Sequence, residues 1–369
     1  MDRSGAISPT LFATFTLACA LSSLPSNAQP VYSLQNLGPL GAGQSMVGAI
    51  NNSGAAVGFI TDSQGNQVPV TLNGQVNFLA GTGQATSLND AGTVIGTTYV
   101  NGTPYVTEWP NGSSTNLGIA GFGTSINNAG EVAGGYQTST GQLHAFTWSN
   151  GAFVDLGTLN GGTWSSAYAV NSSGQIAGTS SIAGGAFRAF FSNGSGLVSL
   201  GTLGGSNSHA VAMNDAGQVV GNAQTSRGLA NAFLWNNGVM TNLGTLGGTQ
   251  SFAYGINDSG NIVGDSWTAG NQTTAGFLYC NGIMLDLNSL IPVNSGWTIN
   301  AAYAINGSGD ILGTGLFNGE SYAVELRPTK DITSDPLTTP EPGALFLAAL
   351  GLLVIATIYC ASRHTHHVS

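Results

Sequence analysis

The sequence predicts an all-β protein whose body, residues 29–328, is a seven-bladed β-propeller closed by its own N-terminal strand. Three observations carry this prediction. Apolar residues alternate with polar or small ones over short runs, which is the pattern of strands. One glycine motif recurs seven times along the body. The last repeat lacks a strand that the first residues of the body supply.

The recurring motif is Asn-x-x-Gly-x-x-x-Gly, and its copies follow one another at steps of 38 to 49 residues. A period of roughly 40–45 residues with four short strands is typical of a propeller blade. The residue before each Asn is aliphatic and the one before that is small, so we expect a strand with a small-residue face that suits the crowded centre of a ring. The seven asparagines are Asn51, Asn89, Asn127, Asn171, Asn214, Asn257 and Asn306.

Two kinds of turn divide each repeat. The glycine motif itself predicts a tight turn that Asn begins and a Gly with positive φ completes. An Asn-Gly pair between apolar runs, such as Asn237-Gly238, predicts a second hairpin in each of the first six repeats. In the fifth repeat the second, third and fourth strands are therefore expected at 218–221, 231–235 and 239–244.

The seventh repeat predicts how the ring closes. It ends after a third strand at 321–326, and Pro328 blocks its continuation. Residues 31–38 match the fourth-strand pattern at the other end of the body. We therefore expect the N-terminal strand to complete the last blade and remove the open edges. An open solenoid is the alternative, but a solenoid would not need the strand missing from the last repeat to be supplied by the start of the body.

Residues 1–28 are predicted to be a signal peptide. Arg3 gives the positive start, and residues 11–24 form the apolar stretch. Small residues precede a predicted cleavage site after Ala28. An uncleaved anchor is the alternative that the short apolar run disfavours.

The other end of the chain predicts a membrane segment. Residues 343–360 contain no charge, and an 18-residue helix spans roughly 27 Å, enough for the hydrocarbon core. Residues 329–339 are a Thr, Asp and Pro-rich spacer. Between spacer and helix stand Pro340, Glu341 and Pro342.

This order of triplet, apolar helix and basic end resembles the PEP-CTERM sorting signal, which would cover residues 340–369. The resemblance implies processing by an exosortase, a membrane-embedded enzyme of bacteria that make exopolysaccharide. The family's tail usually carries several Arg, whereas this chain has Arg363 followed by three His within four residues. The single permanent charge weakens the preference for a cytoplasmic C-terminus.

A second resemblance lies in the third and fourth strands. The run 144–148, His-Ala-Phe-Thr-Trp, followed by Asn150-Gly151 and by Asp-Leu-Gly-Thr-Leu at 155–159, resembles the HAF extracellular repeat. Residues 231–235 and 243–248 repeat the pattern, although only His144 fills the His position. The resemblance covers roughly residues 30–328. It implies an extracellular location and no particular reaction.

Composition excludes some partners. Charged residues are 6 % of the chain and the net charge is −10. A body without a basic surface is not expected to bind nucleic acid or anionic membrane surfaces. The membrane is therefore expected as a partner only through the C-terminal helix.

The sequence predicts no enzyme, cofactor or metal site. It contains no Gly-x-Ser-x-Gly elbow, and its body holds only two His, His144 and His209, both at positions that other residues fill in other repeats. Asp90, Asp215 and Asp258 each stand alone in a turn, whereas calcium loops need several acidic oxygens in one short stretch. A glycan-active hydrolase or lyase with two facing carboxylates stays open as the alternative.

The six tryptophans fall into two groups of three, and the second group predicts the binding surface. Trp109, Trp148 and Trp235 share one third-strand position and are expected in the core between blades. The other three fall in or next to the long loops that should emerge on one face of the disc. Because an aromatic ring can stack on a sugar, we expect these residues to contact exopolysaccharide or surface glycan, and packing within the loops is the alternative for each of them. They are Trp164, Trp267 and Trp297. The predicted function is thus a non-enzymatic binding or structural role at the cell envelope or in the extracellular matrix.

Overall fold

The structure is a computed structural model that describes residues 31–39 and 46–329. The predicted signal peptide 1–28 with Ala28, and the predicted sorting segment with Pro340, Glu341, Pro342 and the helix 343–360, lie outside the described residues. Within the described residues, no helix is both long and apolar enough to cross a membrane.

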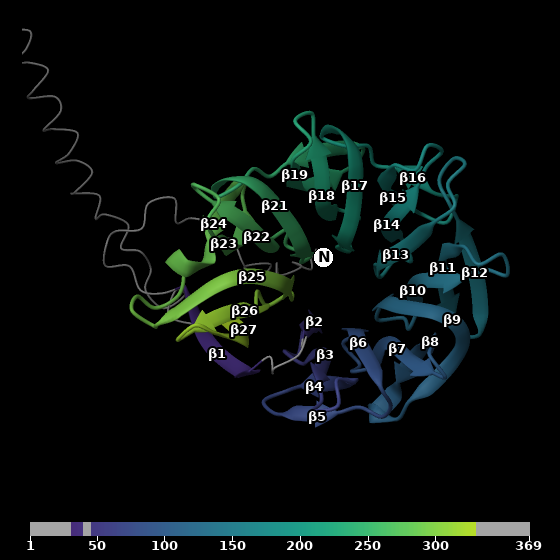
Figure 1. Ribbon diagram of the computed structural model, residues 1–369, viewed down its shortest axis with the longest axis horizontal. Helices are drawn as coiled ribbons and strands as arrows, with labels where there is room; N and C mark the ends of the chain where they lie inside the picture. The colour runs from purple at the N-terminus through teal and green to yellow at the C-terminus, as the bar shows by residue number, and fades with distance from the viewer. Residues whose placement is uncertain (1–30, 40–45, 330–369) are drawn as a thin grey trace, which may run out of the picture. The chain divides into compact units, whose positions relative to one another are not determined.

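The described chain is all β, and its sheets stand around a central axis in chain order (Figure 1). Four of the sheets have four consecutive strands each. They are β2 (Met46–Ile50), β3 (Ala56–Thr61), β4 (Gln67–Leu72) and β5 (Val76–Phe78); β13 (Ser165–Val170), β14 (Ile176–Ser181), β15 (Phe187–Ser192) and β16 (Val198–Ser199); β17 (Gly204–Met213), β18 (Val219–Thr225), β19 (Ala230–Asn236) and β20 (Val239–Asn242); and β21 (Gly247–Ile256), β22 (Ile262–Thr268), β23 (Thr274–Cys280) and β24 (Ile283–Asp286).

A fifth four-stranded sheet joins the two ends of the body. It contains β25 (Trp297–Ile305), β26 (Ile311–Phe317), β27 (Glu320–Pro328) and the N-terminal strand β1 (Tyr32–Pro39), which pairs antiparallel with β27. Figure 1 shows purple β1 beside yellow-green β27. Val31 and Tyr32 are buried, and their backbone N–H groups both donate to the Leu290 carbonyl oxygen. The predicted all-β propeller and its closure by the N-terminal strand are confirmed.

The second and third repeats depart from the expectation of separate four-stranded sheets. Their strands form one seven-stranded sheet, because β9 pairs with β8 near its start and with β10 from Gly121 to its end. The strand β9 is 12 residues long, so the chain stays extended where other repeats place a loop between sheets. The strands are β6 (Gly83–Leu88), β7 (Val94–Val100), β8 (Thr103–Trp109), β9 (Thr115–Ile126), β10 (Val132–Gln137), β11 (Leu143–Ser149) and β12 (Ala152–Gly157).

Glycine is required at the second glycine position of the motif for a steric reason. Each repeat bulges its first strand where it passes this glycine on the second strand, as between Ala210 and Ala212 opposite Gly221. A Cβ atom at Gly221 would collide with the backbone carbonyl oxygen of His209. The same collision with the first strand would occur at Gly96, Gly134, Gly178, Gly264 and Gly313. Only glycine therefore permits the bulged first strand to pair at this position.

The core lies between neighbouring sheets and is built on one aromatic position. The Phe of the third-strand pattern is fully buried in four repeats, as Phe146, Phe190, Phe233 and Phe277. Trp109 is also fully buried, as predicted, while Trp148 and Trp235 pack against the edge of a core cluster. The Ala-Phe pair of the third-strand motif is thus a packing signal between blades.

Candidate functional site

The propeller has two faces with different loops. Because paired strands are antiparallel, the Asn-x-x-Gly turns all lie on one face, which we call the Asn-turn face. The connections from second to third strands and from one sheet to the next lie on the other, the long-loop face. Trp164 precedes β13, Trp267 is near the end of β22, and Trp297 begins β25, so all three stand on the long-loop face.

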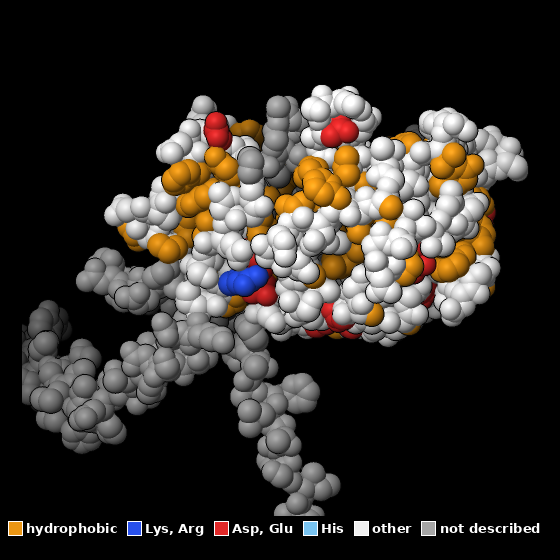
Figure 2. All heavy atoms as spheres, turned by 90° about the horizontal axis from the view of Figure 1, so that it is seen from below, with side chains coloured by type: hydrophobic (Ala, Val, Ile, Leu, Met, Phe, Trp, Pro, Cys, Tyr) orange, Lys and Arg blue, Asp and Glu red, His pale blue; other side chains and the backbone are white. Residues whose placement is uncertain are grey.

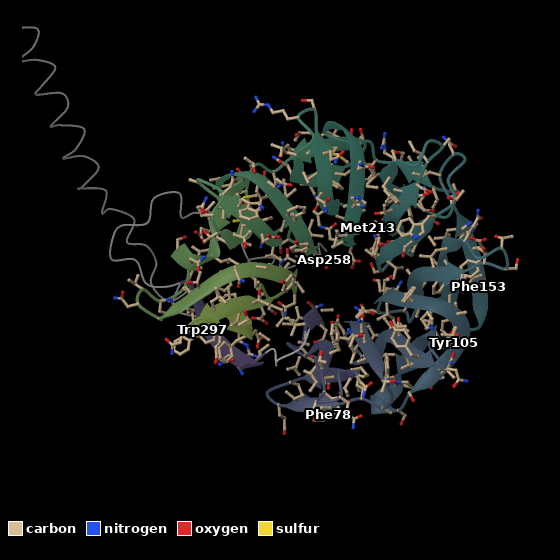
Figure 3. The ribbon with its side chains drawn as sticks, in the orientation of Figure 1. Phe78, Tyr105, Phe153, Met213, Asp258 and Trp297 are labelled. Atoms are coloured by element: carbon tan, nitrogen blue, oxygen red, sulfur yellow. The ribbon has the colours of Figure 1, made fainter. Side chains whose placement is uncertain are left out.

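The three tryptophans do not meet. Trp164 packs edge-on against Phe187 at a centroid distance of 5.5 Å. Trp297 stacks on Phe317 at 5.0 Å and touches Tyr322 edge-on, all within one sheet. Figure 3 shows Trp297 toward the outside of the ring. The predicted glycan contacts would therefore be separate platforms and not one cleft.

The Asn-turn face is held by a closed ring of seven hydrogen bonds. Each motif asparagine donates its Nδ2 amide to the backbone carbonyl of the next one, at 2.9 to 3.3 Å, and Asn306 donates to Asn51 across the seam at 3.0 Å. Each side-chain Oδ1 accepts backbone N–H groups of its own turn, as from Ala129 and Glu131 at Asn127. The repeated asparagine thus joins neighbouring repeats, whereas the sequence predicted only its role in its own turn.

The acidic residues of these turns are occupied in the same way. The Asp90 carboxylate accepts from the backbone and side chain of Asn52 and from the side chain of Asn128. Burial opposes ionisation, but these hydrogen bonds outweigh it and lower the pKa of Asp90 below its ordinary value. Asp215 and Asp258 each accept a backbone N–H from the neighbouring turn. They line a 230 Å³ depression at the mouth of the central channel.

The channel itself is aromatic on one side. Tyr168, Tyr254 and Tyr303 line a 210 Å³ cavity opposite Thr86 and Thr124. The two threonine hydroxyls donate to backbone carbonyls, including one in the next repeat in each case. The channel therefore presents phenol rings and threonine methyl groups.

Asp265 is a half-buried carboxylate beside one of the channel tyrosines. It lies in β22 beside Tyr254, whose hydroxyl donates to it. Its Oδ1 is buried without a hydrogen-bond partner among the described residues. Burial raises the pKa of Asp265 above its ordinary value, although the bond from Tyr254 works against this.

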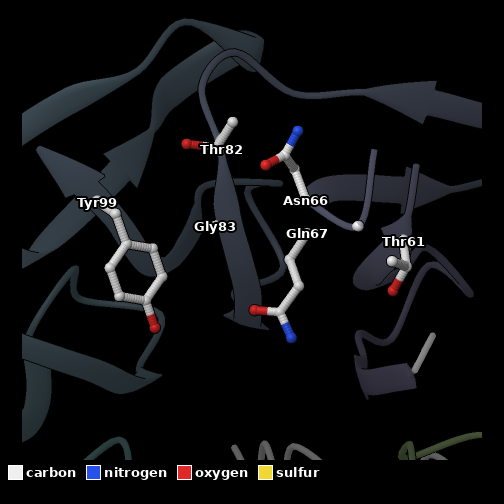
Figure 4. Close-up of a pocket in the computed structure, with 7 residues that line it drawn as sticks. Thr61, Asn66, Gln67, Thr82, Gly83 and Tyr99 are labelled. Atoms are coloured by element: carbon white, nitrogen blue, oxygen red, sulfur yellow. The ribbon is translucent and has the colours of Figure 1, made fainter. Parts of the chain in front are cut away.

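A groove of 440 Å³ lies on the long-loop face. It lies between the β3–β4 turn and the strands β6 and β7 of the next repeat (Figure 4). Figure 4 shows Tyr99 on one side of the strand that carries Thr82 and Gly83, and Asn66 and Gln67 on the other. None of the lining side chains is charged. They are Thr61, Gly65, Asn66, Gln67, Thr82, Gly83 and Tyr99.

Local geometry keeps this groove open. A Cβ at Gly83 would collide with the Thr97 carbonyl oxygen, so the floor is bare backbone with a φ of +149°. The Tyr99 N–H donates to the Thr82 carbonyl at 3.3 Å, which fixes the aromatic residue beside the floor. Tyr99 is 42 % exposed. An exposed ring beside amides and hydroxyls can stack on a sugar and bind its hydroxyl groups.

Sequence analysis missed this groove, although a signal was present. Tyr99 stands three residues after the second motif glycine Gly96, and Trp267 stands three residues after Gly264. The two aromatics thus share one repeat position, which Thr61 and Gln224 fill elsewhere. Comparing repeats at this position would have picked out Tyr99.

The two histidines of the body do not form a catalytic triad. His144 Nδ1 lies 3.1 Å from Asp155, which also accepts from the Tyr136 hydroxyl at 2.8 Å. His209 packs on the Phe187 ring at 5.7 Å, and burial lowers its pKa. Among the described residues, no serine or threonine hydroxyl hydrogen-bonds either ring. No group of three or more His, Cys, Asp or Glu among the described residues could hold a metal ion.

The rim of the ring carries single exposed apolar side chains on the outer strands. Phe78 is 66 % exposed on β5 and Val239 is 63 % exposed on β20. Figure 2 shows hydrophobic side chains along one side of the rim in separate patches among neutral polar groups. The outer strands are short, with three residues in β5 and two in β16, which limits edge-to-edge pairing.

Comparison with known proteins shows the fold class. No protein-family model matches the chain, and no curated protein matches it. A puromycin-hydrolyzing peptidase of Mycobacterium tuberculosis is similar in structure at 10 % identity and a TM-score of 0.52, over 82 % of this chain and 55 % of its own. TolB from Acinetobacter baumannii is 11 % identical with a TM-score of 0.43, and the match covers 74 % of this chain and 63 % of TolB. The WD40 β-propeller domain of Doa1 is 16 % identical with a TM-score of 0.48, and the match covers 82 % of this chain and 99 % of that domain.

The chain is therefore a β-propeller protein. It spans less than two thirds of the length of the peptidase and of TolB. At these identities the likeness extends to the fold alone. The resemblance to HAF repeats and to the PEP-CTERM signal remains a prediction from the sequence.

Proposed function

We propose that this protein is an exported, seven-bladed surface propeller that binds glycan in the long-loop groove and has no enzymatic role. The seven-stranded sheet then counts as two blades that share β9. The closed ring of seven asparagine bonds supports this count, since each bond joins one repeat to the next. The single observation that carries the binding role is the groove beside Tyr99.

The composition of the groove favours a sugar over other ligands. Its lining residues include the side-chain amides of Asn66 and Gln67, the Thr82 hydroxyl, bare backbone and the exposed phenol ring of Tyr99. Sugars present hydroxyl groups at their edge and an apolar face for stacking. A lipid or an apolar peptide could not pair with the side-chain oxygen of Asn66 or the amide donor of Gln67, and burying these groups unpaired is costly.

Trp164, Trp267 and Trp297 extend this role as separate platforms on the same face. A polymer that reaches more than one platform would gain avidity without any new contact type. We therefore propose a long polysaccharide, in keeping with the exopolysaccharide partner that the PEP-CTERM resemblance implies.

The targeting segments complete the proposal. The signal peptide 1–28 would export the chain with cleavage after Ala28. The segment 340–369 would bring it to an exosortase and hold it in the membrane, at least transiently, through the helix 343–360. The proposed location is the cell envelope or the extracellular matrix.

A glycan-active enzyme is the second candidate, and Asp265 is the observation that favours it. A carboxyl group with a raised pKa, next to a tyrosine that lines the channel, has the property of a general acid. The asparagine variant Asp265→Asn separates the two functions. If the wild type releases reducing sugar ends from a glycan and Asp265→Asn does not, the protein is a glycan-active enzyme.

Binding by the full-length protein to a glycan array, followed by titration, tests the proposed role. Tyr99→Ala is expected to lower the affinity about tenfold, because stacking and ring burial are lost. Phe78→Ala removes an even more exposed ring from the rim and should leave the affinity unchanged. The triple variant of Trp164, Trp267 and Trp297 to Ala should weaken polymer binding more than oligosaccharide binding. Equal affinities for wild type and Tyr99→Ala would overturn the role of the groove.

A further inference from the structure

One wall of the groove is organised by a residue that does not line it. In the β3–β4 turn, Asp62 Oδ1 accepts from the backbone N–H groups of Gln64 at 2.9 Å and Asn66 at 2.8 Å. Asp62 Oδ2 accepts from the Asn66 side-chain amide at 3.1 Å. The hydrogen bonds from Asn66 lower the pKa of Asp62 below its ordinary value, so the group is ionised at neutral pH. A fixed negative charge therefore stands beside the groove.

The hydrogen bonds around the groove also fix what its amides offer. The Asn66 amide N–H group is directed to Asp62, which leaves its carbonyl oxygen as an acceptor. Gln67 Oε1 accepts from Gln84 Nε2 at 2.7 Å, which leaves the Gln67 amide as a donor. A sugar hydroxyl both donates and accepts, so it can use both groups. A carboxylate only accepts and can use one.

No cation balances this charge in the groove. The described residues include three arginines and no lysine, and none of the arginines lines the groove. Arg327 pairs with Glu325 at 2.8 Å. Arg188 donates to the backbone carbonyls of Phe187 and Ser206. Proteins that recognise carboxylates usually place an Arg or Lys against them.

From these observations we infer that the groove selects uncharged glycans over acidic ones, and that Asp62 is the residue that sets this selectivity. The inference rests on the proposed function and names the class of its ligand. Asp62 acts in two ways: its charge repels uronic acids, and its bond to Asn66 turns an acceptor toward the sugar. It is a positioning residue and does not itself touch the ligand.

The test uses full-length protein and linkage-matched glycans. The probes are β-1,4, β-1,3 and α-1,4 glucan oligomers, each with its C6-oxidised glucuronic acid form, and the affinity of both members is measured by calorimetry. In Asp62→Asn the new Oδ1 can still accept the two backbone bonds of the turn. Asp258→Asn is the matched control, because it removes the same charge from the Asn-turn face (Figure 3) and also keeps an oxygen that can accept from Asp215.

Wild type should bind the uncharged member of a pair more tightly. At about 10 mM salt, Asp62→Asn should raise affinity for the acidic member roughly fivefold, and this gain should vanish near 1 M salt because the charge is screened. A smaller loss for the uncharged member should persist at both salt concentrations, since it comes from the released Asn66 amide. Asp258→Asn should change neither.

Two results would count against the inference, and they differ. If wild type binds uncharged glucans but Asp62→Asn leaves the ratio of affinities unchanged, the selectivity role is wrong while the glycan-binding role stands. If wild type binds no member of any pair, both fail.

Discussion

The two faces of the propeller are built on opposite principles. On the Asn-turn face the motif asparagine donates to the backbone of the next turn in all seven repeats, so most of its side-chain polar groups are already hydrogen-bonded within the protein. On the long-loop face the equivalent positions differ from repeat to repeat, with Tyr99, Trp267 and Gln224 at one of them. Repetition here marks the scaffold. The departures from it, where aromatic residues replace small or polar ones, mark the candidate binding surface.

The largest effect should come from the Asn-turn face. Asn127→Ala removes the 2.9 Å bond to the Asn171 carbonyl and the two bonds that Oδ1 accepts within its turn. At about 1 kcal/mol net for each bond, the free energy of unfolding should fall by about 3 kcal/mol, measured by urea denaturation of the full-length protein.

Asn128→Ala is the matched control one residue away. Asn128 is exposed and bonds only to Asp90, so its loss should cost less than about 1 kcal/mol. Equal losses for the two variants would mean that the closed ring adds nothing beyond the ordinary turn.

A smaller effect should come from the interior between the faces. The unfolded chain releases the Asp265 proton near the ordinary pKa of 3.8, whereas the folded chain, with its raised pKa, holds the proton to higher pH. The folded state therefore binds more protons over that interval, and stability falls as pH rises through it. Asp265→Asn removes this dependence, so its unfolding temperature should exceed that of wild type at neutral pH.

The difference should shrink as the pH falls below about 3, because Asp265 is protonated in both states only below its ordinary pKa of 3.8. Differential scanning calorimetry across this range measures it. A wild type that stays as stable as Asp265→Asn at every pH would show that burial does not perturb this carboxyl group.

The smallest effect on stability should come from the long-loop face. Trp297 is half-buried and packs on Phe317 and Tyr322 within its own sheet, so Trp297→Ala should lower the free energy of unfolding by about 1 kcal/mol. Polymer binding should fall in the same variant. If urea denaturation instead gives a loss as large as that of Asn127→Ala, Trp297 belongs to the scaffold and the contrast between the faces disappears.

Much of the fold could be predicted because the repeat fixes it locally. Asn-Gly pairs such as Asn150-Gly151 take positive φ at both residues, as a two-residue hairpin turn requires. The fourth-strand pattern at 31–38 was sufficient to place β1 against β27. The merging of two repeats through β9 was not predicted, because strand pattern alone does not reveal whether a short connection stays extended.

Less of the candidate site could be predicted. The tryptophans were singled out by their positions in or next to the long loops, but the groove depends on Asn66, Gln67 and Tyr99, which come from two repeats and are common residue types. Their shared property is that they line one hollow, which lies between two repeats beside the bare backbone at Gly83. Nothing in the order of residues along one strand reports which side chains two neighbouring sheets bring together.

The position of β27 has a mechanical consequence. This strand is hydrogen-bonded on both edges, to β26 and to β1, and it is the last strand of the described residues. A tension applied to the chain beyond Thr329 would enter the propeller at the end of β27, where Tyr32 pairs with Pro328. It would have to separate two ladders of backbone hydrogen bonds together before the ring could open. The seam that closes the propeller is thus also the point at which it would resist being pulled from one end.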